Sequence, residues 1–407
     1  MKRVRTATTA GPVNGGVAGA NLGALRSHNT ALVLGLLRDA GAEGISRLEL
    51  AERTGLTPQA VSKITARLRA QGLAAEAGRR ASTGGKPRTV LRLVPEAGHA
   101  VGVHLDRDEL RVVLVDLDGA VVGERRGELD LGAGAEAVLG AVCEAVRGVV
   151  GESGAGPGAG AGCGGGDTSA GGGGLASVGS LLGSLLGVGV ALPGPLDHVR
   201  GVLHRVTGFP EWDGFPLRDA LAERLGVPVV VDKDTNAAAL GLAVGGEEGA
   251  AGRSFAYLHL GTGLGAGLVI GGSVHRGART GAGEFGHQVV QLDGPVCECG
   301  NRGCVEALCL AAVARGEVAE AARVLGVAAG NLVGLLDIDV VLLGGRTVAV
   351  APETYVSGVG EVLGARARRE GTGGDAVPVR VAPRGERIVA EGAAQLLLAP
   401  LFGRGED

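Results

Sequence analysis

Three cysteines lie within eight residues of one another, and this cluster constrains the fold of the chain more than any other feature. They are Cys297, Cys299 and Cys304, and His287 lies ten residues before the first of them. Three thiolates and one imidazole suit a tetrahedral structural zinc site, and glycines in the segment allow a short loop to turn around an ion. The segment therefore predicts one structural Zn²⁺ held by these four residues. A redox cluster or free thiols are the alternative.

The remaining cysteines do not extend this site. The chain has six Cys in 407 residues, and its basic start is followed by no apolar signal-peptide core. It also contains no run of about 20 apolar residues that would span a membrane. We therefore expect a cytoplasmic protein without a membrane partner, whose cysteines stay reduced. Cys309 is spaced as though on a following helix and is interpreted as a small core residue.

Charge is divided unevenly along the chain. The net charge is −4, yet residues 1–95 contain 15 Lys and Arg against 5 Asp and Glu, and the remainder is acidic. A basic segment joined to an acidic body indicates a nucleic-acid-binding domain attached to a domain with another role. The alternative is a basic domain that is simply soluble, so the pattern of residues has to decide.

That pattern predicts three helices in the basic segment, of which the second and the third have a capped start. Residues 29–40 carry apolar positions at helical spacing. A second helix is predicted to start after Ser46, where Glu49 completes a capping box, and to end near Gly55.

A third helix is predicted to start with Thr57 as N-cap and Pro58 as its first residue. It buries Val61, Ile64 and Leu68 and leaves a polar, basic face outside. Two helices joined by a short Gly-containing turn, the second polar outside, are typical of a helix-turn-helix, whose partner is a double-stranded DNA operator. The residues predicted to contact DNA from these helices are Arg47, Thr57, Gln59, Ser62, Lys63 and Arg67.

Two short strands should follow as a wing. They are predicted at 73–76 and 89–93, with a basic, small-residue segment between them. Lys86 and Arg88 of this segment are predicted to reach the minor groove or the phosphates. A solvated hairpin, and for the helices an ordinary three-helix module, are the alternatives.

The acidic body is predicted to be an α/β domain with mixed sheets, because predicted strands alternate with predicted helices. A glycine-rich segment interrupts it: 13 of the 24 residues in 151–174 are Gly. Such a segment buries too little apolar surface to offset the ordering of its backbone, so we expect a disordered surface insert. A phosphate-binding loop is the alternative, although no strand precedes the glycines and no G-K-[ST] follows them. The predicted strands are 101–105, 111–117, 120–122, 187–192, 228–231, 255–260 and 265–270, and the predicted helices are 135–150, 216–225 and one from Asn236.

The chain resembles the ROK family of repressors, open reading frames and sugar kinases. The spacing of the segment 283–287, the three clustered cysteines and Glu306 matches the zinc and sugar motif of that family. Further matches lie in the basic N-terminal segment, which we call the head, and in the acidic body. They are 46–51, 54–57, 61–62, 84–87, 191–197, 234–240, 261–267 and 342–345.

This resemblance implies an N-terminal winged helix-turn-helix followed by an actin-like, ribonuclease-H-type body of two lobes. A sugar would bind between the lobes, with zinc holding the sugar-reading loop in place. The implied division is a flexible tail at 1–20, the DNA-binding domain at 21–95, a first lobe at 96–238, and a second lobe at 239–407 that contains the zinc site and whose last helix returns to the first lobe.

By position, Glu284, His287 and Glu306 would hydrogen-bond sugar hydroxyls, and Asp234 occupies the place of the general base in kinase members. Lys233 stands where the family usually has a sugar-contacting Asn. It would pair with Asp234 or select an acidic or phosphorylated ligand. The sugar-binding set implied by the resemblance is Lys233, Asp234, Glu284, His287 and Glu306.

Besides Lys233, the sequence departs from the family at two further places. Kinase members carry Asp-x-Gly-x-Thr after the first strand. The corresponding residues 104–109 of this chain include Asp106, Asp108 and Glu109 and contain no glycine. Three carboxylates would repel the phosphates of ATP. We therefore expect no catalytic residue and treat Asp234 as a vestigial base. The segment 307–326 is also short, which predicts a reduced second lobe and dimer surface.

Together these features predict a sugar-responsive transcriptional regulator, a repressor, that forms a homodimer or a dimer of dimers. Ligand binding between the lobes would change the spacing of two heads. An ATP-dependent sugar kinase and a DNA-binding protein with a ligand-free dimerisation body are the alternatives.

Overall fold

A computed structural model describes the head and both lobes of the body. Residues 1–21 and the glycine-rich segment 155–184 lie outside the part of the chain that it describes. The described residues are 22–80, 88–154, 185–206, 208–245, 253–371 and 376–404.

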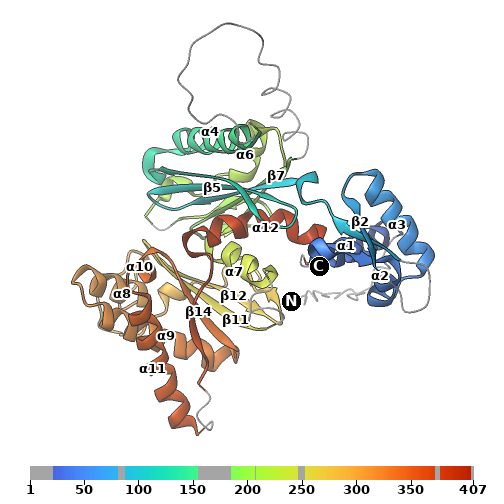
Figure 1. Ribbon diagram of the computed structural model, residues 1–407. Helices are drawn as coiled ribbons and strands as arrows, with labels where there is room; N and C mark the ends of the chain where they lie inside the picture. Colours follow the sequence, from blue (N-terminus) through green and yellow to red (C-terminus); the bar gives the residue numbers. More distant parts are fainter. Residues whose placement is uncertain are drawn as a thin grey trace, which may run out of the picture.

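The head is a winged helix-turn-helix, drawn in blue beside the end of helix α12 in Figure 1. Its wing is a three-stranded sheet in the order β1-β3-β2, one strand more than the sequence predicts. The added strand β1 pairs Ile45 with Leu91, and its two residues are too short for an alternating pattern. The elements of the head are α1 Leu22–Asp39, β1 Ile45–Ser46, α2 Arg47–Thr54, α3 Pro58–Ala70, β2 Ala74–Arg80 and β3 Arg88–Leu93.

Both predicted helix starts in the head are confirmed. Ser46 Oγ accepts a hydrogen bond from Glu49 N at 3.3 Å, while Glu49 Oε2 accepts one from Ser46 N at 2.8 Å. Thr57 Oγ1 accepts from Ala60 N at 3.2 Å. These bonds satisfy backbone N–H groups that have no partner in the first turn of a helix. The two helices of the DNA-binding motif are thus defined by their own local sequence.

The first lobe is a five-stranded mixed sheet in the order β10-β7-β4-β5-β6. Helices α4 and α6 cover one face of it (Figure 1). Helix α4 continues to Gly154, so the expected start of the insert at residue 151 is wrong by four residues; Ser153 Oγ donates to Val149 O in its last turn. The elements of this lobe are β4 His99–Leu105, β5 Glu109–Asp116, β6 Val121–Glu128, α4 Ala135–Gly154, β7 Leu185–Leu192, β8 Leu196–Asp197, β9 Val202–Leu203, α6 Leu217–Leu225 and β10 Val229–Lys233.

The second lobe is another five-stranded sheet, in the order β13-β12-β11-β14-β15. The predicted hairpin is confirmed, with Phe255 opposite Val269. Helices α8, α9 and α11 pack on one face of the sheet. The elements are β11 Phe255–Leu260, β12 Leu264–Ile270, β13 Ser273–Val274, α8 Val305–Ala314, α9 Val318–Leu336, β14 Val340–Gly344, α10 Arg346–Val350, α11 Pro352–Glu370 and β15 Val379–Val381.

Two helices lie between the sheets, α7 (Asp234–Val244) and α12 (Ile388–Leu401) (Figure 1). Helix α12 packs on α7 and on strands β4 and β7 of the first lobe, and the expected lobe boundary at 238/239 falls inside α7. The backbones approach so closely that only glycine fits. A Cβ on Gly102 would lie 1.9 Å from Ala390 O, and one on Gly392 would lie 1.9 Å from Ala237 O. Part of the glycine content therefore serves the packing of α12.

The head and the body share one hydrophobic core. Leu37 of α1 belongs to the same buried cluster as Leu398 of α12 and Val113 of β5. Polar contacts reinforce this junction: Arg404 Nη2 lies 2.5 Å from Asp39 Oδ1. The head, expected as a separate domain at 21–95, is therefore packed firmly against α12.

Candidate functional site

The four predicted metal ligands converge at the start of α8. His287 ends the short 3₁₀ helix η6 (Phe285–His287), Cys297 and Cys299 lie in the loop that follows, and Cys304 is the N-cap of α8. Their ligand atoms all lie within 4.8 Å of one another. The distance is 3.7 Å from His287 Nδ1 to Cys297 Sγ, and 3.7 Å from Cys299 Sγ to Cys304 Sγ.

These spacings suit a tetrahedral zinc ion. With Zn–S bonds of about 2.3 Å and Zn–N bonds of about 2.0 Å, neighbouring ligand atoms of a tetrahedron lie roughly 3.5–3.8 Å apart. A disulfide would instead bring two sulfurs to about 2.05 Å, and the described cysteines are all free thiols. The donor set and its spacing therefore fit a structural zinc ion.

The backbone of this loop is held independently of any ion. Cys297 N donates to Asn301 O at 2.8 Å, and Gly300 N donates to Cys297 O at 2.9 Å. Gly303 has a φ of 67°, and a Cβ there would lie 1.5 Å from Gln291 O. Only glycine allows the chain to turn here and bring Cys304 back to the other ligands.

A cavity of about 90 Å³ lies between the lobes beside this cluster, and we call it the interlobe cavity. Its walls include the loop after β4, the β10–α7 junction, the turn 259–265 and η6. The tertiary structure brings all the side chains of the expected sugar set to its walls. They are Lys233, Asp234, Glu284, His287 and Glu306.

Lys233 is tied to the second lobe. Its Nζ donates to Ala282 O and, at 3.1 Å, to Glu284 Oε1, and its side chain is only 3% exposed. The pairing with Asp234 considered from the sequence is therefore wrong, because the carboxylate bonded to the ammonium is that of Glu284. Asp234 opens α7 and accepts a hydrogen bond from Thr235 N at 2.6 Å instead. With its charge matched by Glu284, Lys233 has less capacity to select an acidic ligand.

Asp234 lines this cavity with a carboxyl group whose pKa is strongly raised. Burial raises the pKa of Asp234 to about 7, and the negative charges of Asp106 and Glu284 act in the same direction. The hydrogen bond from Thr235 N and the ammonium of Lys233 oppose the rise without cancelling it. A carboxyl group with such a pKa exchanges a proton near neutral pH, as a general base must.

Glu306 has a structural contact that its sequence pattern does not reveal. It lies in the first turn of α8, is 7% exposed, and its Oε2 accepts a hydrogen bond from Leu264 N at 2.7 Å. This bond joins the helix that follows the metal ligands to the glycine-rich turn at 261–267. Glu306 therefore positions that turn, in addition to lining the cavity.

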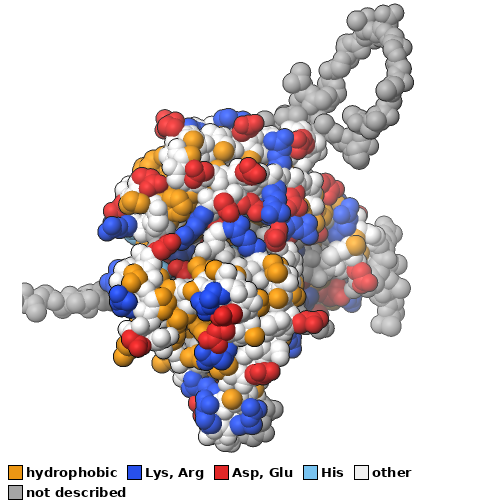
Figure 2. Space-filling model, turned by 90° about the vertical axis from the view of Figure 1, so that its left-hand side faces the viewer, with side chains coloured by type: hydrophobic (Ala, Val, Ile, Leu, Met, Phe, Trp, Pro, Cys, Tyr) orange, Lys and Arg blue, Asp and Glu red, His pale blue; other side chains and the backbone are white. Residues whose placement is uncertain are grey.

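The loop after β4 is bonded to the second lobe at three points, which we call the interlobe clasp. Figure 2 shows acidic and basic side chains side by side along the seam between the lobes. The partners are 156 to 238 residues apart in the chain, so no local pattern predicts them. The contacts are Asp106 Oδ1 with Thr262 Oγ1 at 2.9 Å, Arg107 Nη1 with Glu298 Oε2 at 3.4 Å, and Asp108 Oδ2 with Arg346 Nη2 at 3.0 Å.

The polar face of α3 is open to solvent. Arg67 Nη2 also donates to Thr30 Oγ1 at 2.5 Å, which holds it against α1. Lys86 lies outside the described residues. The other predicted DNA contacts all have exposed side chains: Arg47, Thr57, Gln59, Ser62, Lys63, Arg67 and Arg88.

One helix within the described stretches, α9, is long and apolar enough to cross a membrane. Half of its apolar window is buried, against α8 and α11. A helix of a protein core has the same length and composition, so this is weak evidence for a membrane span.

Two family profiles match the chain. The profile of the ROK family covers residues 175–314, and one described as a winged helix-turn-helix DNA-binding domain covers residues 31–74. The first match contains the metal ligands and most of the interlobe cavity. The second contains α2 and α3.

Similar proteins include both repressors and kinases. The xylose repressor of Caldicellulosiruptor bescii is 27% identical over 282 residues, 69% of this chain and 63% of the repressor, so the chain spans about three fifths of that relative. The crystal structure of a ROK hexokinase from Thermus thermophilus is 30% identical, covers 73% of this chain and 96% of its own, and has a TM-score of 0.54. The crystal structure of a ROK family transcriptional regulator, a homologue of the E. coli MLC protein, is 20% identical to this chain. The match covers 93% of this chain and 98% of the regulator, with a TM-score of 0.70. The last likeness shows that the fold of head and body together is shared.

Proposed function

The chain belongs to the ROK family, and from this membership we propose that it is a DNA-binding transcriptional repressor whose body responds to a sugar or sugar derivative. The observation that carries the proposal is the core shared by the head and α12. Helix α12 packs on α7, and Asp234 at the start of α7 lines the interlobe cavity. A ligand in the cavity thus has a continuous packed route to the DNA-binding face.

DNA binding is supported by the exposed polar face of α3 and by the basic composition of the head. Residues on this face would read base edges, and the cations at its margins would contact phosphates. We infer a homodimer or a dimer of dimers, in which two heads occupy two half-sites of a double-stranded operator. Exposed apolar side chains on the second lobe, Leu335 and Leu292 among them, offer a surface for such pairing.

Sugar recognition is supported by the side chains that line the interlobe cavity. Glu284 and Glu306 would accept hydrogen bonds from hydroxyl groups, and His287 would use the ring nitrogen that does not face the cysteines. A bound structural zinc ion would fix the positions of its four ligands. The cavity of about 90 Å³ is smaller than the usual ligand site of about 300–1,000 Å³, so sugar entry would separate the lobes.

The loop after β4 supports a body that does not transfer phosphate. In kinase members the corresponding turn holds the phosphates of ATP, whereas here Asp106 and Asp108 place two carboxylates in it and bond them to the second lobe. Negative charge at this point would repel a triphosphate. We infer that the phosphate loop has become part of the clasp between the lobes.

A sugar kinase is the second candidate, because one observation favours it. Asp234 lies in the interlobe cavity with a pKa raised to about 7, which suits a base that accepts a proton from an attacking hydroxyl. A third candidate retains DNA binding and makes the body a ligand-free dimerisation unit.

One set of measurements separates the three candidates. The zinc-loaded full chain is used to select binding sites from fragmented genomic DNA, and the sites are then footprinted with and without a panel of sugars. The proposal predicts a protected site that a sugar releases, and a response lost in Glu284→Gln but retained in the exposed control Glu353→Gln.

The other outcomes are equally informative. Absence of any protected site with and without sugars would refute the proposal. Protection without a sugar effect, together with no sugar binding by calorimetry, would establish the ligand-free body. ADP release with a sugar and ATP, abolished in Asp234→Asn, would establish the kinase.

A further inference from the structure

The side chain of Lys233 bonds across the boundary between the lobes. Lys233 ends strand β10 of the first lobe. Its Nζ donates to Ala282 O and to Glu284 Oε1, and both acceptors belong to the loop between β13 and η6 of the second lobe, which we call the 275–284 loop. Its methylene stem packs on Gly194, where a Cβ would lie 2.7 Å from Lys233 Cδ. Because the side chain is buried, packing sets the position of the ammonium.

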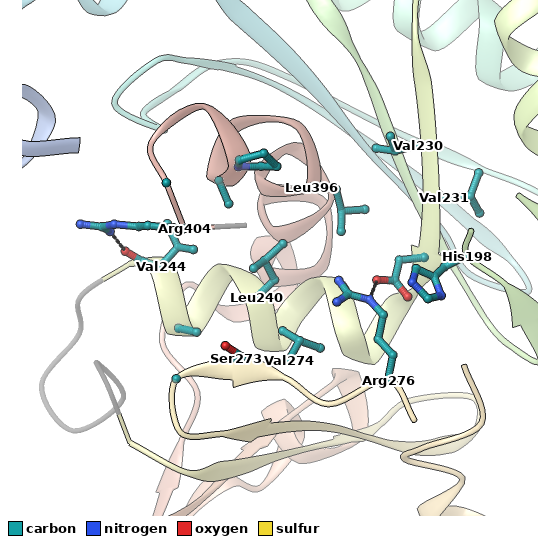
Figure 3. A pocket seen from close by; sticks show the side chains of 16 residues that line it. His198, Val230, Val231, Leu240, Val244, Ser273, Val274, Arg276, Leu396 and Arg404 are labelled. Carbon is teal, nitrogen blue, oxygen red and sulfur yellow. Dashed lines mark hydrogen bonds and ion pairs between the residues drawn. The ribbon is translucent and has the colours of Figure 1, made fainter. Parts of the chain in front are cut away.

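The 275–284 loop is itself fastened to the first lobe. Arg276 Nε donates to Asp232 Oδ2 at 2.7 Å, an ion pair that Figure 3 shows at the neighbouring cavity between β10, β13, α7 and α12. Thr280 Oγ1 lies 2.7 Å from His198 Nδ1. Separating the buried ion pair would leave charges without partners and is therefore costly. The loop thus holds its own acceptors in place beside the ammonium.

Each member of the Lys233–Glu284 pair keeps one hydrogen-bonding position open. An ammonium has three N–H donors, and Lys233 Nζ has two acceptors among the described residues. Glu284 uses Oε1 for the ion pair, and no described residue donates to its Oε2. Both residues line the interlobe cavity. The wall of that cavity therefore offers one donor and, beside it, one acceptor.

The chemistry of these two groups fixes the direction of each bond to a ligand. An ammonium only donates and a carboxylate only accepts, so the ligand must present an acceptor to Lys233 and a donor to Glu284. An anionic group on the ligand would repel Glu284, and a cationic group would repel Lys233. A hydroxyl group both donates and accepts, and two hydroxyls on adjacent carbons lie about one hydrogen-bond length apart, as Nζ and Oε1 do at 3.1 Å. Two adjacent hydroxyls therefore match the pair without adding charge.

We propose that the Lys233–Glu284 pair reads two adjacent hydroxyl groups of an uncharged sugar. One hydroxyl oxygen accepts from Lys233 Nζ, and the other hydroxyl donates to Glu284 Oε2. This inference rests on the proposed sugar response, to which it adds the class of ligand, a neutral vicinal diol, and the residue that selects it. Hydrogen bonds to charged groups are stronger than those between neutral groups, so loss of either hydroxyl costs more affinity than loss of one elsewhere on the ring.

The test is calorimetry on the zinc-loaded full chain with D-glucose, D-galactose, D-mannose, D-xylose and L-arabinose, then with each monodeoxy derivative of the tightest binder. Removing either of two hydroxyls, on adjacent carbons, should weaken binding at least about tenfold. Lys233→Met keeps the length of the side chain and should abolish the penalty for one of these hydroxyls. Glu284→Gln should reduce the penalty for the other. A structural role of Lys233 would instead weaken all derivatives alike.

Arg369→Met and Glu353→Gln are the matched controls. They make the corresponding changes at exposed positions of α11 and should preserve both the affinity and the ranking of the derivatives. Lys233→Gln retains an N–H donor and should keep part of the penalty. Melting curves show which variants are folded, and the derivative series on the unmodified protein is decisive even if none is.

Two outcomes would overturn the inference and leave the proposed sugar response standing. They are penalties at carbons that are not adjacent, and an unchanged ranking of the derivatives in folded Lys233→Met. Absence of binding by every sugar of the panel would overturn both the inference and the sugar response.

Discussion

Thr262 Oγ1, in the second lobe, donates a 2.9 Å hydrogen bond to Asp106 Oδ1 in the first lobe. Burial opposes ionisation of this carboxyl, but His104, the backbone N–H of Arg107 and the Thr262 hydroxyl outweigh it and lower the pKa of Asp106. A charged, half-buried carboxylate is stabilised by such donors. The bond therefore joins the lobes at the position where kinase members of the family hold phosphate.

The Thr262 hydroxyl should stabilise the closed arrangement of the lobes. Thr262→Val keeps the shape of the side chain and removes the donor, which leaves the half-buried carboxylate of Asp106 less well satisfied. We expect a loss of about 1–3 kcal/mol in the free energy of unfolding, measured by urea denaturation, and a larger radius of gyration by X-ray scattering. Thr262→Ser retains the hydroxyl and should retain both properties. Equal behaviour of the two variants would show that the bond does not hold the lobes.

Asp234 should make stability depend on pH. Its carboxyl titrates at about 7 in the folded protein and near 3.9 when unfolded. Its contribution is fully present below about pH 4 and is lost as the pH rises through about 7. Relative to Asp234→Asn, the unmodified protein should lose up to about 1.4 kcal/mol per pH unit across this window.

Urea denaturation at several pH values measures this difference. The exposed Asp213→Asn variant is the control and should follow the unmodified protein. Parallel pH profiles for the unmodified protein and Asp234→Asn would contradict the raised pKa.

Removing one predicted zinc ligand should release the metal. Elemental analysis should find one zinc per chain, and Cys299→Ser should lose it and unfold at a lower temperature, because metal binding stabilises the loop that it folds. Cys143→Ser changes a buried cysteine of the first lobe, far from the cluster, and should keep its zinc. Full zinc content in Cys299→Ser would refute the assignment of ligands.

Lys63 should contribute to DNA binding through charge. It is exposed on α3, and Lys63→Ala should weaken binding to all sequences and reduce the slope of log affinity against log salt by about one. Gel-shift titrations at several salt concentrations measure both. Arg369→Ala, exposed at the end of α11, is the control. An unchanged slope in Lys63→Ala would place the DNA on another face.

The shared core should couple the stability of the head to that of the body. Leu398 is fully buried where α12 meets α1, and Leu398→Ala should cost about 2–5 kcal/mol. Circular dichroism should show one unfolding transition in both proteins, displaced to lower urea in the variant. Two separate transitions in the unmodified protein would indicate that the head folds on its own.

The features that sequence predicts well here are local ones. Ser46 with Glu49, and Thr57 before Pro58, form helix starts because the bonds involved span three residues. The fold class followed from the alternation of strands and helices and from the ROK resemblance, and the profiles and the MLC homologue confirm it. The start of the insert at 151 was wrong because α4 continues through residues whose glycines favour no helix.

The sequence by itself determined the winged head, the mixed α/β body and the set of cysteines and histidine with zinc spacing, because each depends on residues close together in the chain. Only the tertiary structure decided that Lys233 pairs with Glu284, that Asp106 bonds Thr262, and that the head shares a core with α12. These contacts join residues far apart in the chain, and whether they meet depends on how the two sheets and α12 pack. The cysteine cluster constrains the fold only locally. Tertiary packing alone places the interlobe cavity and the interlobe clasp beside it.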